Sequence, residues 1–135
     1  MRLHIVTPQE GVQVEQLDVS SVTATGAFGE LVLLPGHEAL LASLAPGRLS
    51  YTEFGRTHHF YASGGFLQFV NDKVRILAES LVPVTQLDTI EVGLELERAI
   101  EALQSAEDRS PPNLKKLEAA VTATRAKLAV AKRRH

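Results

Sequence analysis

The pattern of apolar and polar residues changes character once along the chain, near Pro83. From Leu3 to Glu79, short runs with mostly alternating apolar positions are separated by glycine, proline or Asn-Asp, which is typical of strands joined by tight turns. Asn71-Asp72 predicts a hairpin turn, because both residues tolerate left-handed backbone conformations. Gly64-Gly65 predicts a bulge or a close approach of two backbones. The expected strands are residues 3–6, 12–19, 22–25, 31–34, 49–54, 58–62, 66–70 and 74–77.

One of these runs, Leu31–Leu34, has no polar residue, which predicts a strand covered on both faces. Pro35-Gly36 ends it, because proline removes a backbone donor and glycine accepts a positive φ. The following His37-Glu38 is expected to form an exposed loop tip. A second apolar run at residues 39–45 ends in the same way, at Pro46-Gly47.

After Pro83 the apolar residues recur at the three- and four-residue spacing of a helix. Asp88 followed by Thr89-Ile90-Glu91 predicts the helix start, with Asp88 as the N-cap. Gly93 lies inside this helix at a cost of about 1 kcal/mol, so the first turn is expected to fray. The expected apolar face consists of Leu87, Ile90, Leu94, Leu96, Ile100 and Leu103.

The segment Arg109–Asn113, with two prolines, interrupts the helical pattern, and Ser110 is expected to cap a second helix. The second apolar seam is Leu114, Leu117, Val121, Thr124, Leu128 and Ala131. A short connection between two helices predicts an antiparallel hairpin. The fold class is therefore segregated α+β: an antiparallel β-sandwich or flattened barrel at residues 1–86, then a two-helix hairpin at residues 87–135.

Charge is divided between the two expected helices. The first is acidic, and the second is basic through Lys115, Lys116, Arg125, Lys127, Lys132, Arg133 and Arg134. Exposed ion pairs contribute only about 0 to 1 kcal/mol each and are screened by salt, so the hairpin is expected to be modestly stable. A basic helix that is weakly held can leave for an acidic protein surface, which makes the hairpin a candidate switch.

Composition excludes several function classes. The 135 residues carry a net charge of −2 and no cysteine, so disulfides, thiolate catalysis and cysteine zinc sites are excluded. No apolar run approaches the ~20 residues of a membrane helix, and no secretory signal is evident, so any work at a membrane requires a partner. His58 and His59 point to opposite faces of a strand, and phosphate-loop and nucleophile motifs are absent. We expect no enzyme, no metal site and no nucleic-acid partner.

Six motifs stand in the same order as in a known family: Gly29-Glu30-Leu31, Leu34-Pro35-Gly36-His37, Leu40-Leu41, Pro46-Gly47, Ser63-Gly64-Gly65-Phe66 and Val74–Glu79. Through them the chain resembles the epsilon subunit of the F-type ATP synthase. The resemblance implies a non-catalytic rotor subunit of the central stalk, which links the gamma subunit to the membrane c-ring in coupling proton transport to ATP synthesis. It also implies a peripheral position on the cytoplasmic face of the bacterial inner membrane.

The resemblance further implies that the helices can inhibit ATP hydrolysis by contacting the beta and alpha subunits. The residues alone leave an alternative open: a small β-domain with a coiled-coil arm that joins an unrelated complex through its basic helix. Co-purification of gamma, beta and ring subunits would separate the two.

Candidate contact residues follow from the same resemblance. Glu30, Pro35, Gly36, His37 and Glu38 would face the gamma subunit and the rotor ring, although ordinary loop solvation also accounts for exposed side chains here.

Some family members bind ATP on the hairpin through Ile/Leu-Asp-x-x-Arg-Ala, from which this chain departs. In one register Glu91 replaces the arginine, and in the other Glu95 replaces the aspartate ahead of Arg98-Ala99. We therefore expect no cofactor; residues that would contact ATP are Asp88, Glu95, Arg98 and Arg125.

Overall fold

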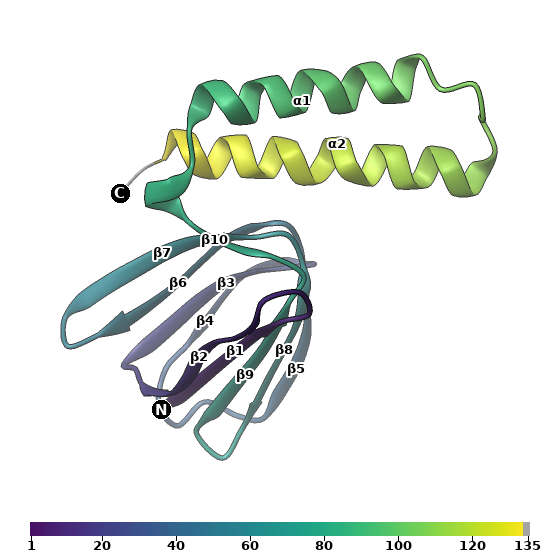
Figure 1. Cartoon of the computed structure of the whole chain (residues 1–135). Coiled ribbons are helices and arrows are strands. Elements are labelled where there is room, and N and C mark those ends of the chain that lie inside the picture. Colours follow the sequence, from purple (N-terminus) through teal and green to yellow (C-terminus); the bar gives the residue numbers. More distant parts are fainter. Residues whose placement is uncertain (134–135) are drawn as a thin grey trace. The chain divides into compact units, whose positions relative to one another are not determined.

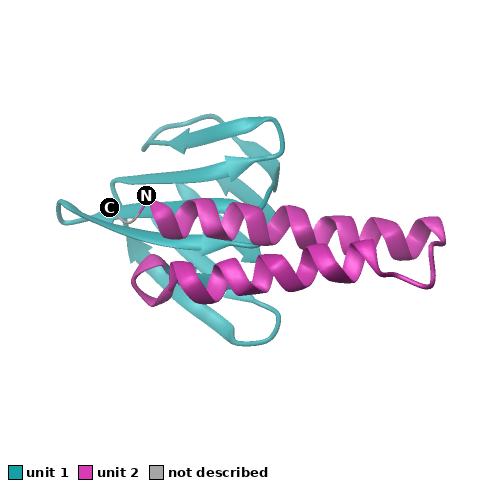
Figure 2. Ribbon diagram, turned by 90° about the horizontal axis from the view of Figure 1, so that it is seen from above, with its two compact units in different colours: residues 1–83 teal, residues 84–135 magenta. Residues whose placement is uncertain are grey.

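The structure is a computed structural model that describes residues 1–133 (Figure 1). The chain divides into two compact units, Met1–Pro83 and Val84–His135 (Figure 2). The first unit is built of strands and the second of helices, so the expected segregated α+β fold is confirmed.

A ten-stranded sheet forms the first unit. Its strands are β1 (Arg2–Thr7), β2 (Gly11–Asp18), β3 (Ser21–Gly26), β4 (Gly29–Leu33), β5 (Leu40–Leu44), β6 (Gly47–Glu53), β7 (Arg56–Ala62), β8 (Gly65–Val70), β9 (Lys73–Ala78) and β10 (Leu81–Pro83). They lie in the order β10-β7-β6-β3-β5-β8-β9-β1-β2, and β4 pairs with β3. The pairings are antiparallel except that of β1 with β9, which is parallel and joins the start of the chain to the last long strand.

The sheet curls so that inward-facing side chains meet in one hydrophobic core (Figure 1). Residues alternate strictly in the central strands: in β9, Val74, Ile76 and Ala78 are buried while the residues between them are exposed. Leu3, Leu67 and other core side chains are fully excluded from solvent. Each fully buried aliphatic side chain contributes about 1.5–3 kcal/mol, so this core stabilises the unit.

Two tight turns in this unit depend on residues with positive φ. Asn71 (φ 51°) and Asp72 (φ 58°) form the hairpin between β8 and β9, as predicted. A Cβ on Gly65 would collide with the backbone carbonyl of Leu77, so the predicted close approach of two backbones is also confirmed.

The interpretation of Leu31–Leu34 as a strand covered on both faces is wrong. In β4, Leu33 is buried, but Val32 is 49% exposed and Leu34, just beyond the strand, is 55% exposed. The reason is that only one face of β4 meets the core: Leu31 and Leu33 point inward, and Val32 between them points to solvent, as in an antiparallel sheet with one solvated face.

The second unit contains a 3-10 turn (Val84–Gln86) and the antiparallel helices α1 (Thr89–Gln104) and α2 (Pro111–Lys132), which lie side by side (Figure 2). Asp88 caps α1 as predicted, since its side chain accepts a hydrogen bond from the Ile90 amide at 2.8 Å. Ser110 occupies the N-cap position of α2, but its side chain makes no capping hydrogen bond.

The predicted apolar face of α1 is wrong in its first two turns. Ile90 and Leu94 are 74% and 46% exposed, whereas Val92 is 2% exposed. The partly buried apolar side chains that follow Val92 are Leu96, Ala99, Ile100 and Leu103. The predicted face is therefore wrong only at Ile90 and Leu94, where Val92 packs instead. In α2, Val121 and Ala131 of the predicted seam are buried, and Val130, outside that seam, is buried as well.

Candidate functional site

The segment after β4 is a defined turn. The amide of His37 donates to the carbonyl of Leu34 at 3.1 Å, and Gly36 between them has φ 84°. Proline at the second position and a positive φ at the third are the features of a type II turn. Pro35, Gly36, His37 and Glu38 are all exposed.

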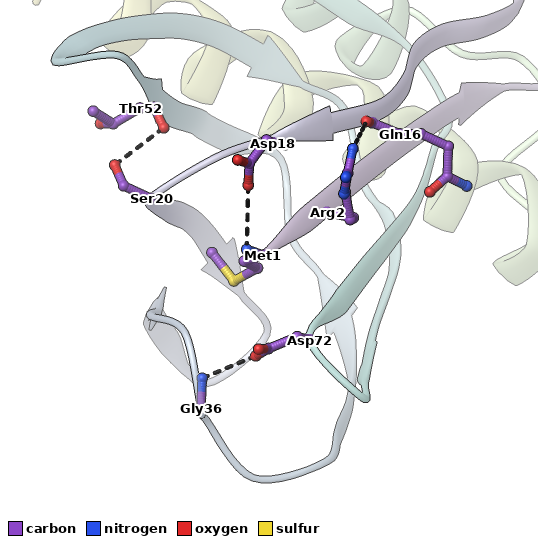
Figure 3. A network of polar contacts seen from close by, with 8 residues as sticks. All are labelled: Met1, Arg2, Gln16, Asp18, Ser20, Gly36, Thr52 and Asp72. Carbon is purple, nitrogen blue, oxygen red and sulfur yellow. Dashed lines mark hydrogen bonds and ion pairs between the residues drawn. The ribbon is translucent and has the colours of Figure 1, made fainter.

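A second turn holds this one in place (Figure 3). The amide of Gly36 donates to Oδ1 of Asp72 at 2.9 Å, which ties the turn to the β8–β9 hairpin. The ring of His37 contacts Phe69 edge-on at 5.8 Å between centroids, and its Nδ1 donates to the Glu38 carbonyl at 2.8 Å. Exposed side chains are therefore presented on a backbone that is fixed, which suits a binding surface.

Glu30 lies on β4, exposed and paired in register with Thr25 of β3. It lines a groove of about 550 Å³ formed by residues 26–31 and 40–43. Phe28, at the tip of the β3–β4 hairpin, is fully exposed, and Leu41 is 74% exposed. The sequence analysis did not predict that these two apolar side chains are exposed. For Phe28, the available signal was a large apolar residue directly before Gly29 in a turn.

A second surface, also missed, lies on the outer face of the sheet. The outer apolar surface consists of Val6, Val12, Leu41, Phe66 and Leu77. Strand register places Val12 beside Val6, Val6 beside Leu77, and Leu77 beside Phe66. Phe66, Val12 and Leu77 are 57%, 53% and 47% exposed. The sequence carries the signal in Phe66-Leu67-Gln68-Phe69-Val70, where apolar residues occupy both faces of one strand.

Cations border this surface on one side. The next row of the sheet pairs His4 with Arg75 and Arg75 with Gln68, and the row after it pairs Arg2 with Lys73. Arg2 also donates to the Gln16 carbonyl at 3.2 Å (Figure 3). A depression of about 480 Å³ includes side chains of both kinds, among them Leu77, Phe66 and Arg75.

The basic residues of α2 are mostly in solvent. Lys115, Lys116, Arg125, Lys132 and Arg133 are exposed. Lys127 is different, because its Nζ lies 3.1 Å from Oε2 of Glu95 on α1 and its side chain is 23% exposed. Arg134, also predicted to belong to the basic helix, lies outside the described residues.

Two of the four ATP candidates have partners within the described chain. Asp88 serves as the helix cap and Glu95 binds Lys127. Arg98 and Arg125 are exposed. A depression of about 360 Å³ at Asp88 is lined by residues 85–89 only. Two of the carboxylates are thus already engaged, and ATP would have to displace their partners.

Histidines lie on the β6–β7 hairpin. The ring of His58 stacks on Tyr51 at 4.9 Å and its Nε2 lies 3.5 Å from Glu53. Burial, followed by the charges of Arg48 and His58, lowers the pKa of His59.

Within residues 1–133, no group of three or more histidine, cysteine, aspartate or glutamate side chains is placed to hold a metal ion. No helix in this range is long and apolar enough to cross a bilayer.

Comparison with known proteins extends these observations. Residues 1–84 match the family model of the ATP synthase delta/epsilon chain, beta-sandwich domain. The ATP synthase epsilon chain of Geotalea daltonii is 38% identical over 112 residues, which cover 82% of this chain and 80% of that relative. The epsilon chain of Nitratidesulfovibrio vulgaris is 36% identical over 130 residues, 96% of this chain and 87% of the relative.

Solved structures agree. A chain of the Euglena gracilis mitochondrial ATP synthase, determined with OSCP, F1 and c-ring, matches with a TM-score of 0.80 and 27% identity, over 96% of this chain and 79% of that one. A chain of the Tetrahymena thermophila central stalk and c-ring matches in fold, with a TM-score of 0.59 and 18% identity. The strand unit, the helical hairpin and the extent of these similarities lead to one conclusion: the chain belongs to the family of ATP synthase epsilon chains.

Proposed function

We propose that this chain is a non-catalytic rotor subunit of an F-type ATP synthase, in which residues 1–86 link the gamma subunit to the c-ring. The family membership supports this assignment, and the fixed Pro-Gly turn is the observation that carries it. That turn is held by the Leu34–His37 and Gly36–Asp72 hydrogen bonds, and its side chains are exposed to a partner. A rotor component must transmit torque, which requires a contact surface that does not yield.

In this proposal Glu30, Pro35, Gly36, His37 and Glu38 contact the rotor ring and gamma. The chain has no cysteine, so Glu30→Cys introduces a single crosslinking site without any other substitution. Crosslinking within the assembled enzyme should capture gamma or the polar loops of the ring. The matched control is Glu15→Cys, an exposed carboxylate position on β2. Capture of neither partner from position 30, or equal capture from position 15, would contradict the proposal.

The helical hairpin, residues 87–135, has a separate proposed role as an inhibitor of ATP hydrolysis. Most of its basic residues are exposed, and among those of residues 111–132 only Lys127 is paired with a carboxylate of α1, so α2 presents cations to acidic segments of the beta and alpha subunits. Contact there would oppose rotation in the hydrolysis direction.

Deletion of the residues after Leu87 tests the inhibitory role. The truncated chain retains the entire strand unit, so it should assemble normally while the ATPase activity of the enzyme increases. A second variant, Lys115→Glu with Lys116→Glu, should reproduce part of that increase without shortening the chain. Unchanged hydrolysis in both energised and uncoupled membranes would refute the inhibitory role and leave the rotor role intact.

The proposed location is the cytoplasmic face of the bacterial inner membrane, where the chain is held peripherally by its partners. The competing function is an adaptor that joins an unrelated complex through the basic helix. Affinity purification of the full chain from its own membranes distinguishes the two, since the rotor subunit must bring down gamma, beta and ring subunits together. Recovery of a different set of partners would favour the adaptor.

A further inference from the structure

We infer that Glu95 acts as an internal competitor for the basic helix: its ion pair with Lys127 holds α2 against α1 and withholds this cation from an acidic partner. The inference rests on the proposed inhibitory role of the hairpin and adds the regulation of that role. It gives one ion pair a specific function, whereas the proposed inhibition requires only that α2 is basic.

The ionic contact between the two helices is confined to one place. Both helices carry exposed charged residues, yet among residues 89–132 only one ion pair joins α1 to α2. Nζ of Lys127 donates to both carboxylate oxygens of Glu95, at 3.1 Å and 3.4 Å. A charge-assisted contact of this kind is stronger than a hydrogen bond between neutral groups. Direct ionic attraction between the helices therefore depends on these two side chains.

Lys127 also differs from the other cations of α2 in its surroundings. Its side chain is 23% exposed and that of Glu95 is 44% exposed, whereas Lys115, Lys116 and Arg125 lie in solvent. Partial removal from water reduces screening by salt and makes an unpaired ammonium group costly. Lys127 is therefore held more firmly than a surface lysine, and it becomes available to a partner only when the helices separate.

The position of the pair makes it a contact that closes the hairpin away from its loop. At the loop, Asn113 Nδ2 donates to the Asp108 carbonyl at 2.6 Å, and the Ser110 amide donates to Oδ1 of Asp108 at 3.0 Å. Glu95 lies in the first half of α1 and Lys127 in the second half of α2, far from these bonds. The loop keeps the adjoining helix ends close, so separation of the helices starts at the other end and breaks the Glu95–Lys127 pair.

Competition follows from the chemistry of the pair. A carboxylate on an acidic partner offers the Lys127 ammonium group the same ligand that Glu95 already provides. Glu95 has the advantage of lying on the same chain, where its effective concentration is high. The partner engages Lys127 only in the fraction of molecules whose pair is open, so its apparent affinity falls as the pair becomes stronger. Loss of the Glu95 charge should therefore increase inhibition, although it removes a stabilising contact from the hairpin.

Hydrogen exchange of the full chain tests whether the pair holds the helices together. At about 0.01 M salt, Glu95→Gln should accelerate exchange of the amides at residues 121–130 by about twofold to fivefold, the range expected for a single ion pair. Lys127→Gln should accelerate it equally, and combining the two substitutions should add little. The reversed pair, Glu95→Lys with Lys127→Glu, should restore much of the natural protection. Raising the salt to about 1 M should reduce all of these differences.

The matched control is Glu101→Gln, which removes the same charge from an exposed position of the same helix. Glu101 forms no ion pair among residues 1–133, so this variant should exchange like the natural chain. Circular dichroism and thermal unfolding establish that each variant is folded. Natural exchange in Glu95→Gln, or equal acceleration in Glu101→Gln, would show that the pair does not hold the hairpin and would overturn the inference.

ATP hydrolysis by the assembled enzyme tests the competition. In enzyme rebuilt with each variant, Glu95→Gln should lower ATPase activity by up to about the same twofold to fivefold factor. The reversed pair should not lower it, because its hairpin is closed and position 127 is no longer cationic. Equal activity of the Glu95→Gln enzyme and the natural enzyme would overturn the inference. If deletion of the residues after Leu87 also leaves hydrolysis unchanged, the inhibitory role fails as well; a response to the deletion without a response to Glu95→Gln overturns the competition alone.

Discussion

Replacement of Gly93 by alanine should stabilise α1. Gly93 lies in the interior of this helix, outside the set of residues with positive φ. A Cβ built there meets no atom within 4 Å, so the methyl group fits without displacing a neighbour. Both conditions are necessary, because alanine gains over glycine only where the backbone is helical and the space is open.

The expected gain is about 0.8–1.0 kcal/mol, the difference between glycine and alanine in a helix interior. Since about 1.4 kcal/mol changes an equilibrium constant tenfold, this gain corresponds to about a fourfold to fivefold shift in any equilibrium that unfolds this part of α1. No tertiary contribution is added, since the new methyl group contacts nothing beyond its own helix.

Hydrogen exchange of the backbone amides measures this change directly. Amides of residues 96–100 should exchange fourfold to fivefold more slowly in Gly93→Ala when exchange reports the opening equilibrium. The control is Gly55→Ala in the β6–β7 turn, where a Cβ also meets nothing within 4 Å but φ is 75°. That variant should lose about 1–2 kcal/mol through backbone strain and leave the exchange of α1 unchanged.

Comparing Gly93→Ala with Gly55→Ala measures the effect of backbone conformation alone, because the added methyl group and the free space around it are the same at both glycines. If Gly93→Ala accelerates exchange in α1, or if Gly55→Ala stabilises the protein, then the reasoning from φ and open space is refuted. A gain well above about 1 kcal/mol would show that the methyl group makes contacts the structure does not contain.

Three further predictions follow from local geometry. Gly65→Ala should destabilise the strand unit by more than about 3 kcal/mol, because its Cβ collides with the Leu77 carbonyl; equal denaturation midpoints would contradict this. Asp88→Ala should reduce the stability of α1 by about 1 kcal/mol, measured by hydrogen exchange or circular dichroism. Ser110→Ala removes no capping hydrogen bond and should reduce stability much less. Equal losses in the two variants would argue against the Asp88 cap. The lowered pKa of His59 means that this ring takes up a proton more readily in the unfolded chain than in the folded chain, so the stability of the fold should decrease as pH drops from about 7.5 to 5.5. In thermal unfolding, His59→Gln should reduce that decrease. An unchanged pH profile in this variant would exclude the His59 ring as its source.

Local sequence chemistry predicted the Asn71-Asp72 turn and the Asp88 cap, whereas Ser110 occupies its N-cap position without the expected capping hydrogen bond. Asn71-Asp72 and Asp88 each act through backbone groups within a few residues, so their geometry follows from residue type. The close approach at Gly65 was also predictable, since a glycine inside a strand pattern leaves room for a second backbone where a side chain would collide. The turn and the cap do not depend on which distant element packs alongside.

Predictions that depend on distant partners were less accurate. Whether both faces of Leu31–Leu34 are covered depends on what packs above and below β4, and an unbroken apolar run does not show that only one of its faces meets the core. In α1, both the Ile90/Leu94 face and the Val92/Leu96 face are apolar, so spacing alone does not select the face that packs. The outer apolar surface was missed for a related reason, because alternation identifies a strand without telling which apolar set is inside.

The parallel pairing of β1 with β9 also constrains how the strand unit forms. During synthesis β1 and β2 emerge well before β9, so one edge of β1 stays unpaired until Lys73–Ala78 has followed. A contact between segments so distant in the chain requires closing a long loop, which makes folding slow and exposes the waiting edge to other strands. The unpaired edge of β1 is therefore open to association with other strands during synthesis, even though the inward side chains of β1 are among the most deeply buried in the folded protein.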